Sequence, residues 1–92
     1  METPTTIILK SLADDTRLSI VRNLAKNNCE ESSSSIVSDC AASLELSQPT
    51  MSHHFKKLVH AGVLTERKAG TEKFYKLNYD LLKSIGIDAS QL

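Results

Sequence analysis

The 92-residue sequence has no tryptophan, only two tyrosines and two phenylalanines, three glycines and two cysteines. It also has no apolar run near the roughly 18 residues that a membrane span requires, so we expect no membrane association. The first ten residues lack the basic start and apolar stretch of a signal peptide, which predicts a cytoplasmic protein. Cys29 and Cys40 are too few for the disulfide framework of a secreted domain, so we expect reduced thiols.

Several kinds of catalytic motif are also missing. The sequence has no glycine-rich phosphate loop, no Cys/His cage for a metal and no nucleophile with a base at motif spacing. A chain of this length has room for one domain, residues 1–92, with a modest core and little space for a pocket. We therefore expect a protein that is not an enzyme and that uses no cofactor.

The charges balance overall, but they are unevenly distributed. Residues 1–46 contain four Lys/Arg and seven Asp/Glu, a net charge of −3, whereas residues 47–92 contain seven Lys/Arg and four Asp/Glu, a net charge of +3. Segregation of this kind leaves the second half able to attract a polyanion.

The positive half begins with the most informative stretch of the chain. Ser47 is a typical N-cap, Pro49 suits the first turn of a helix, and Gly62 is a typical C-terminal stop, so we predict a helix over 48–61. Its apolar positions recur at helical spacing and form one stripe, made of Met51, Phe55, Leu58 and Val59. Its opposite face contains no carboxylate and consists of Thr50, His53, Lys56, Lys57 and His60. This pattern is typical of the recognition helix of a helix-turn-helix.

The remaining elements complete a mainly α fold with one β-hairpin. We expect helices over 4–12, 13–27 and 36–44, a serine-rich surface loop over 27–35, strands over 63–68 and 72–77, and a short helix that Asn78 or Asp80 caps and Gly86 ends. We expect the tail over 87–92 to be weakly ordered, and Arg17 and Arg22 to lie on a solvated face. The order of elements predicts a winged helix-turn-helix with about five helices and a two-stranded wing. Three wing cations, Arg67, Lys68 and Lys73, are expected to contact phosphates.

Several runs together resemble the ArsR/SmtB family of winged-helix transcriptional repressors. They are LADDTRL at 12–18, LSQPTMSHHFKKL at 46–58, AGVL at 61–64 and FYKL at 74–77. The resemblance implies a homodimeric repressor of a roughly palindromic double-stranded operator, released by an inducer. It also implies that the positions reading the major groove are Ser47, Gln48, Thr50, Ser52 and His53, with Lys56 and Lys57 supplying salt-dependent affinity.

Other features of the resemblance are weaker. The family's metal-binding Cys-x-Cys-Asp run is matched here by residues 36–39, Ile-Val-Ser-Asp, and its C-terminal metal site lacks histidine, so we expect no metal. Two alternatives stay open: a redox-responsive repressor using Cys29 and Cys40, and a protein-interaction module. For His54, a structural role and a DNA contact are equally expected. His60 lies near the C-terminal end of its helix, where we expect it to interact favourably with the helix dipole and not to read a base. We expect dimerisation through six apolar residues: Ile7, Ile8, Leu12, Leu81, Leu82 and Ile85.

Overall fold

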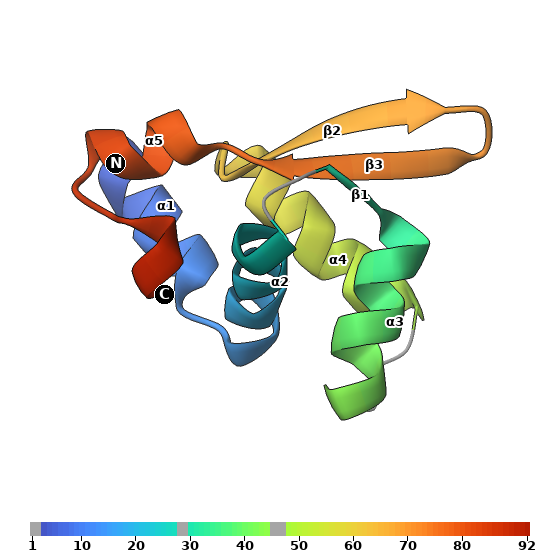
Figure 1. Ribbon diagram of the computed structural model, residues 1–92. Coiled ribbons are helices and arrows are strands. Elements are labelled where there is room, and N and C mark those ends of the chain that lie inside the picture. Colours follow the sequence, from blue (N-terminus) through green and yellow to red (C-terminus); the bar gives the residue numbers. More distant parts are fainter. Residues whose placement is uncertain (1–2, 28–29, 45–47) are drawn as a thin grey trace.

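The computed structural model describes residues 3–27, 30–44 and 48–92, together with the side chains of those residues except at positions 39–44, 48 and 49. In these ranges the chain forms five α-helices, a three-stranded sheet and a final 3₁₀ turn (Figure 1). Among the described residues, none of the helices combines the length and the apolar character needed to span a bilayer.

The first two helices begin where the sequence places capping residues. Helix α1 (Pro4–Leu12) starts at Thr3, whose hydroxyl accepts a hydrogen bond from the Thr6 amide, with Pro4 in the first turn. Helix α2 (Asp15–Asn27) follows, and the Asp14 carboxylate accepts from the Arg17 amide at 3.0 Å. Both helices were predicted within a residue or two of these limits.

Helix α3 (Ser33–Leu44) begins three residues earlier than predicted. The Ser35 amide donates to the Ser32 hydroxyl at 3.2 Å, so Ser32 caps this helix and not Ser34 or Ser35. Helix α4 (Gln48–His60) matches the predicted recognition helix. Together with the hairpin described next, these helices confirm the predicted winged helix-turn-helix.

The wing belongs to a sheet of three strands, in the order β1-β3-β2. Strands β2 (Leu64–Ala69) and β3 (Glu72–Leu77) form the predicted antiparallel hairpin. Strand β1 (Glu31–Ser32) pairs with the other edge of β3, placing Glu31 opposite Tyr75. The prediction of an irregular loop over 27–35 is therefore wrong for residues 31–35. Residues 31 and 32 are ordered by main-chain pairing with a distant strand, and residues 33–35 form the first turn of α3.

The end of the chain is ordered, contrary to the prediction. Helix α5 (Tyr79–Ser84) is capped by Asn78, as one of the two predicted alternatives, and the chain turns at Gly86 with a φ of 83°. The 3₁₀ turn η1 (Ala89–Gln91) then returns onto α2. Ala89 is buried. The Arg22 Nε donates to the Leu92 carbonyl at 2.8 Å, while Arg22 itself stays exposed, as expected.

The core lies where α1, α2 and α4 meet the sheet, and it includes residues that we expected elsewhere. Ile8, Leu12 and Leu82 are 2%, 9% and 0% exposed, so they pack inside one protomer and cannot form a dimer surface. Apolar residues on a short helix give the same sequence pattern whether the protein's own core or a second protomer covers them. Large exposed hydrophobic side chains are instead Leu9 on α1 and Tyr79 on α5, helices that lie at the same end of the molecule (Figure 1).

Candidate nucleic-acid interface

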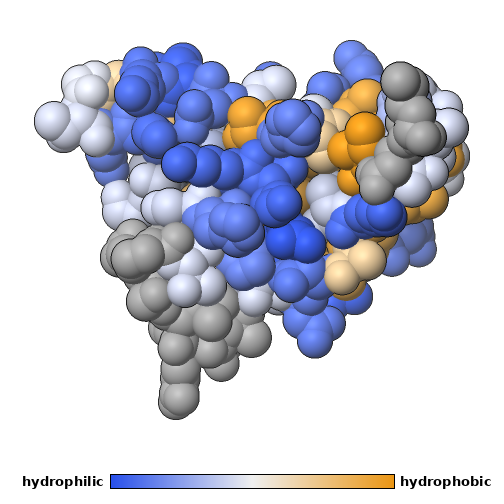
Figure 2. All heavy atoms as spheres, turned by 180° about the vertical axis from the view of Figure 1, so that it is seen from behind, coloured by the Kyte–Doolittle hydropathy of each residue, from blue (hydrophilic) through white to orange (hydrophobic). Residues whose placement is uncertain are grey.

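Helix α4 separates its apolar and polar residues onto two faces. Met51, Phe55 and Leu58 are 0%, 3% and 0% exposed, and Phe55 stacks on Tyr75 of β3 with ring centroids 4.5 Å apart. The exposed positions on the other face are Ser52, His53, Lys56, Lys57 and His60. Burial of the stripe therefore fixes the helix so that donors and positive charge face outward. Seen from behind in Figure 2, hydrophilic residues cover the middle of the molecule and hydrophobic ones gather toward the end where α1 and α5 lie.

The beginning of α4 is described only in part. The helix starts at Gln48 with Pro49 in its first turn, as predicted, and Thr50 is half-buried. Ser47, the predicted cap and base contact, lies outside the described residues, as does the side chain of Gln48. Their roles stay predictions.

The end of α4 sets the angle at which the wing leaves it. The Gly62 amide donates to the Val59 carbonyl and the Val63 amide to the Leu58 carbonyl, both at 3.0 Å, which closes the helix in a Schellman-type turn. Gly62 has a φ of 85°, and a Cβ there would lie 3.2 Å from a methyl carbon of Leu81. The positive φ therefore favours glycine at this position, and a Cβ would in addition crowd the end of the Leu81 side chain.

His54 lies on the inner edge of α4 and joins it to the junction of α1 and α2. Its Nδ1 lies 3.3 Å from an Nη1 of Arg17 and 3.8 Å from the Asp14 carboxylate, and the side chain is 12% exposed. Burial lowers the pKa of His54 below its ordinary 6.5, and the positive charge of Arg17 acts in the same direction, whereas Asp14 opposes them. Since a guanidinium can only donate, Nδ1 accepts and the ring is neutral.

Arg17 holds a fixed position through this cluster. Its Nε donates to the Ser11 carbonyl at 2.6 Å while its Nη1 contacts His54, so the prediction of a solvated arginine is wrong. The backbone N–H of Arg17 also lowers the pKa of the Asp14 carboxyl. His54 therefore has the structural role, the first of its two expected alternatives. No pattern in the sequence indicates this cluster, apart from the short separation of Asp14 and Arg17 along the chain.

Arg67 forms an ion pair with Glu30, a contact that was not predicted from the sequence. Its guanidinium makes two-pronged contacts with Glu30, the shortest at 2.7 Å, and stacks 4.6 Å from the centroid of the Phe74 ring. The hydrogen bond from Arg67 lowers the pKa of Glu30. Arg67 therefore bridges the wing to the residue preceding β1.

The other two wing cations face each other. Lys68 and Lys73 are paired across the hairpin, and like charges directly opposite each other destabilise a sheet unless an anion lies nearby. Lys73 also lies 3.6 Å from the Glu66 carboxylate, which accepts a hydrogen bond from the Tyr75 hydroxyl at 3.0 Å. Burial, followed by this contact with Glu66, raises the pKa of Tyr75 above its ordinary value.

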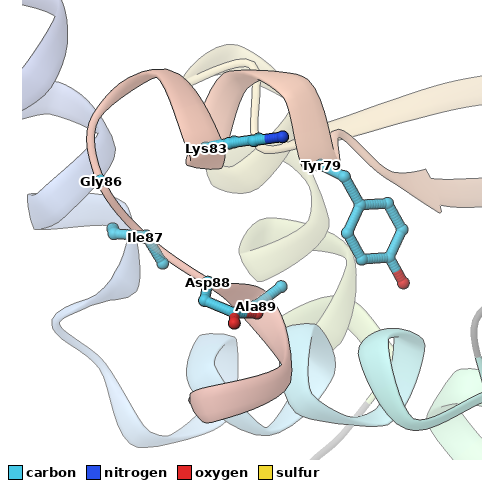
Figure 3. A pocket seen from close by; sticks show the side chains of 6 residues that line it. All are labelled: Tyr79, Lys83, Gly86, Ile87, Asp88 and Ala89. Carbon is cyan, nitrogen blue, oxygen red and sulfur yellow. The ribbon is translucent and has the colours of Figure 1, made fainter.

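Other parts of the molecule are poorer candidates for a ligand, metal or redox site. A hollow of about 460 Å³ lies between α5 and η1, with Lys83 extending toward Tyr79 on one side and Asp88 and Ala89 on the other (Figure 3). Within the described ranges, no group of three or more His, Cys, Asp or Glu side chains is placed to hold a metal ion. Ile36, at the start of the run that matches the family's metal ligands, is buried in the core. Cys29 and the side chain of Cys40 lie outside the described residues, so the redox alternative stays a prediction.

Comparison with known proteins identifies relatives for most of the chain. Residues 14–66 match the model of the family described as "Bacterial regulatory protein, arsR family". The chain is 40% identical over 78 residues to the arsenical resistance operon repressor of Staphylococcus aureus, an alignment covering 85% of this chain and 69% of that protein.

Solved structures show the same fold. HlyU from Vibrio cholerae is 31% identical, with a TM-score of 0.70, over 92% of this chain and 89% of that one. The transcriptional repressor PagR of Bacillus anthracis is 29% identical, also with a TM-score of 0.70, over 89% and 87% of the two chains. The aligned part therefore includes the helix-turn-helix and most of the elements around it.

Proposed function

Because this chain belongs to the arsR family of bacterial regulatory proteins, we propose that it represses transcription in the cytoplasm by binding a roughly palindromic operator as a homodimer. The family makes it a DNA-binding transcriptional regulator and not an enzyme, as the sequence predicts. One α4 helix would lie in the major groove of each half-site.

The observation that supports this proposal best is the outer face of α4. All its described exposed side chains are hydroxyl, imidazole or ammonium groups, which can donate hydrogen bonds to base edges or phosphates. A helix that bound another protein would instead be expected to expose apolar anchors, and here Met51, Phe55 and Leu58 are all turned inward. This contrast favours a DNA interface over the protein-interaction module.

The proposed contacts divide into two classes. Base edges are read by five positions near the start of α4: Ser47, Gln48, Thr50, Ser52 and His53. Phosphates are bound by four lysines, which position the protein without reading sequence: Lys56, Lys57, Lys68 and Lys73. Arg67, the fifth predicted cation, would join them only on leaving Glu30, which holds it in this structure. The paired wing lysines support the second class, because a phosphate beside Lys68 would relieve the repulsion that Glu66, which lies 3.6 Å from Lys73, leaves between them.

The proposed dimer surface combines α1 with α5. Leu9 is 50% exposed and Tyr79 is 37% exposed, and Leu81 and Ile85 are only partly buried. Exposed apolar residues gathered on two helices mark a site for association. A second copy of the chain, related by two-fold symmetry, would cover this surface and set the two α4 helices at matching distances from the axis.

A binding experiment tests the proposal. Fluorescence anisotropy would compare DNA from upstream of the protein's own gene with a scrambled duplex at two salt concentrations. His53→Ala should cost about 1–3 kcal/mol on the operator and little on the scrambled duplex, whereas Lys68→Ala should weaken both alike and reduce the salt slope by about 1. Lys26→Gln, at an exposed position on α2, is the matched control.

Two outcomes would count against the proposal. If the wild-type protein binds both duplexes equally and weakly, it does not read this operator, and a protein partner becomes the better explanation. If His53→Ala and Lys68→Ala both leave operator binding unchanged, α4 and the wing are not the interface. Adding candidate inducers or an oxidant to the same titration would test release from DNA and the thiol alternative.

A further inference from the structure

A cleft of about 360 Å³ lies between α1 and the last turns of α4. Its lining comes from three helices and comprises Ile7, Lys10, Ser11, Arg17, Lys57, His60 and Ala61. Four of these side chains are cationic or can become so, and none of the described lining residues is acidic. Positive charge from separate parts of the chain therefore converges on one hollow.

Such an arrangement favours an anionic ligand. Cations brought together around a cleft repel one another, and a bound anion converts that repulsion into attraction. The Asp14 carboxylate caps α2 and lies beside His54, and it does not line the cleft.

Arg17 is already held in place in the wall of the cleft. Its Nε donates to the Ser11 carbonyl at 2.6 Å and its Nη1 contacts the His54 ring at 3.3 Å. A guanidinium fixed in this way has little rotamer freedom left to lose when a ligand binds. Its planar fork is suited to the oxygens of a phosphate, and the lysines add point charges.

We propose that this cleft binds a phosphate group. Arg17 and Lys57 face it as donors, His60 supplies a further donor at the end of α4, and Lys10 adds charge from α1. The phosphate comes either from the backbone of bound DNA or from a free phosphate-bearing molecule. The first source rests on the proposed function, whereas the second does not.

The binding test uses the intact protein and inorganic phosphate. In ¹H–¹⁵N correlation spectra, phosphate should produce saturable shifts at the amides of Ser11, Arg17, Lys57 and His60, beyond those caused by sodium chloride of equal ionic strength. The double variant Lys10→Gln/His60→Gln changes two exposed side chains and should weaken this binding several-fold. Lys26→Gln should leave it unchanged, and urea unfolding would verify that all variants fold.

The same variants in the DNA titration distinguish the two sources. If the cleft takes a backbone phosphate, the double variant loses affinity for operator and scrambled duplex alike, and the salt slope falls by about 0.9 for each lost contact. If it takes a free phosphate-bearing molecule, the phosphate shifts weaken while DNA affinity is unchanged. The proposal is overturned if phosphate gives no saturable shifts at the cleft and DNA binding by the double variant is also unchanged. Operator preference by the wild type would then still support the proposed function.

Discussion

The stability of the protein should decrease in mild acid because His54 is neutral in the folded state. Its Nδ1 accepts from Arg17, and protonation would remove that acceptor and place a positive charge beside the guanidinium. Burial lowers the pKa of His54 in the folded protein below 6.5, the ordinary value expected in the unfolded chain. Between these two pKa values the unfolded chain binds more protons than the folded one, so acid favours unfolding.

The sign and the limiting size of the effect follow from linkage. The contribution of His54 to the free energy of unfolding is complete above its unfolded pKa and is lost as the pH falls toward its folded pKa. For one proton, the slope in that window cannot exceed about 1.4 kcal/mol per pH unit. Asp14 reduces the effect, because its carboxylate lies 3.8 Å from Nδ1 and favours the charged ring.

Urea unfolding followed by circular dichroism between about pH 5 and pH 7.5 measures this slope. His54→Gln keeps a neutral acceptor for Arg17 at every pH, so the variant should show a flatter stability profile than the wild type below about pH 6.5. His60→Gln changes an exposed histidine that lies outside the cluster around His54, and it is the matched control. An identical slope in His54→Gln and wild type would refute the assignment of a neutral, accepting His54.

Three further predictions concern the wing, the dimer and the core. Glu30→Gln should release Arg67 to bind phosphate, raising affinity for operator and scrambled DNA together and steepening the salt slope by about 0.9 in anisotropy titrations; unchanged binding would mean that Arg67 does not reach DNA. Leu9→Lys should raise the dimer dissociation constant by about tenfold or more in sedimentation equilibrium without unfolding the protomer, and an unchanged constant would place the interface elsewhere. Phe55→Ala should cost about 3–5 kcal/mol in urea unfolding because it removes a buried ring stacked on Tyr75, and a cost below 1 kcal/mol would contradict that packing.

The sequence was sufficient to predict those elements whose structure depends on residues close together in the chain. The apolar stripe of α4, its first-turn proline and the glycine after it predicted the helix and the turn into the wing. Alternation on both sides of a short glycine-containing loop likewise predicted the hairpin. These features depend on residues within one or two turns of each other, so they can be read directly from the chain.

Contacts between distant residues could not be predicted in this way. Strand β1 has only two residues and no periodicity, and its pairing with β3 joins positions more than 40 residues apart. Arg22 and the Leu92 carbonyl are 70 residues apart, and their contact ties down a tail expected to be loose. Such pairings are set by the assembled fold and leave no local signature.

The candidate site shows the same division. The exposed face of α4 followed from helical spacing, whereas the binding of Arg67 by Glu30 and the junction between Arg17 and His54 required the three-dimensional arrangement. The prediction of the dimer surface was wrong for Ile8, Leu12 and Leu82 for a related reason. Apolar residues on a short helix can face either a core or a partner, and the pattern alone does not distinguish Ile8 from Leu9.

Hydroxyl-radical footprinting of the purified protein on DNA from upstream of its own gene tests the central claim most directly. A homodimer with one α4 helix in each half-site should protect two patches on one face of the duplex, with centres about one helical turn, or a whole number of turns, apart. A single protected patch, or protection spread evenly along the fragment, would contradict the account.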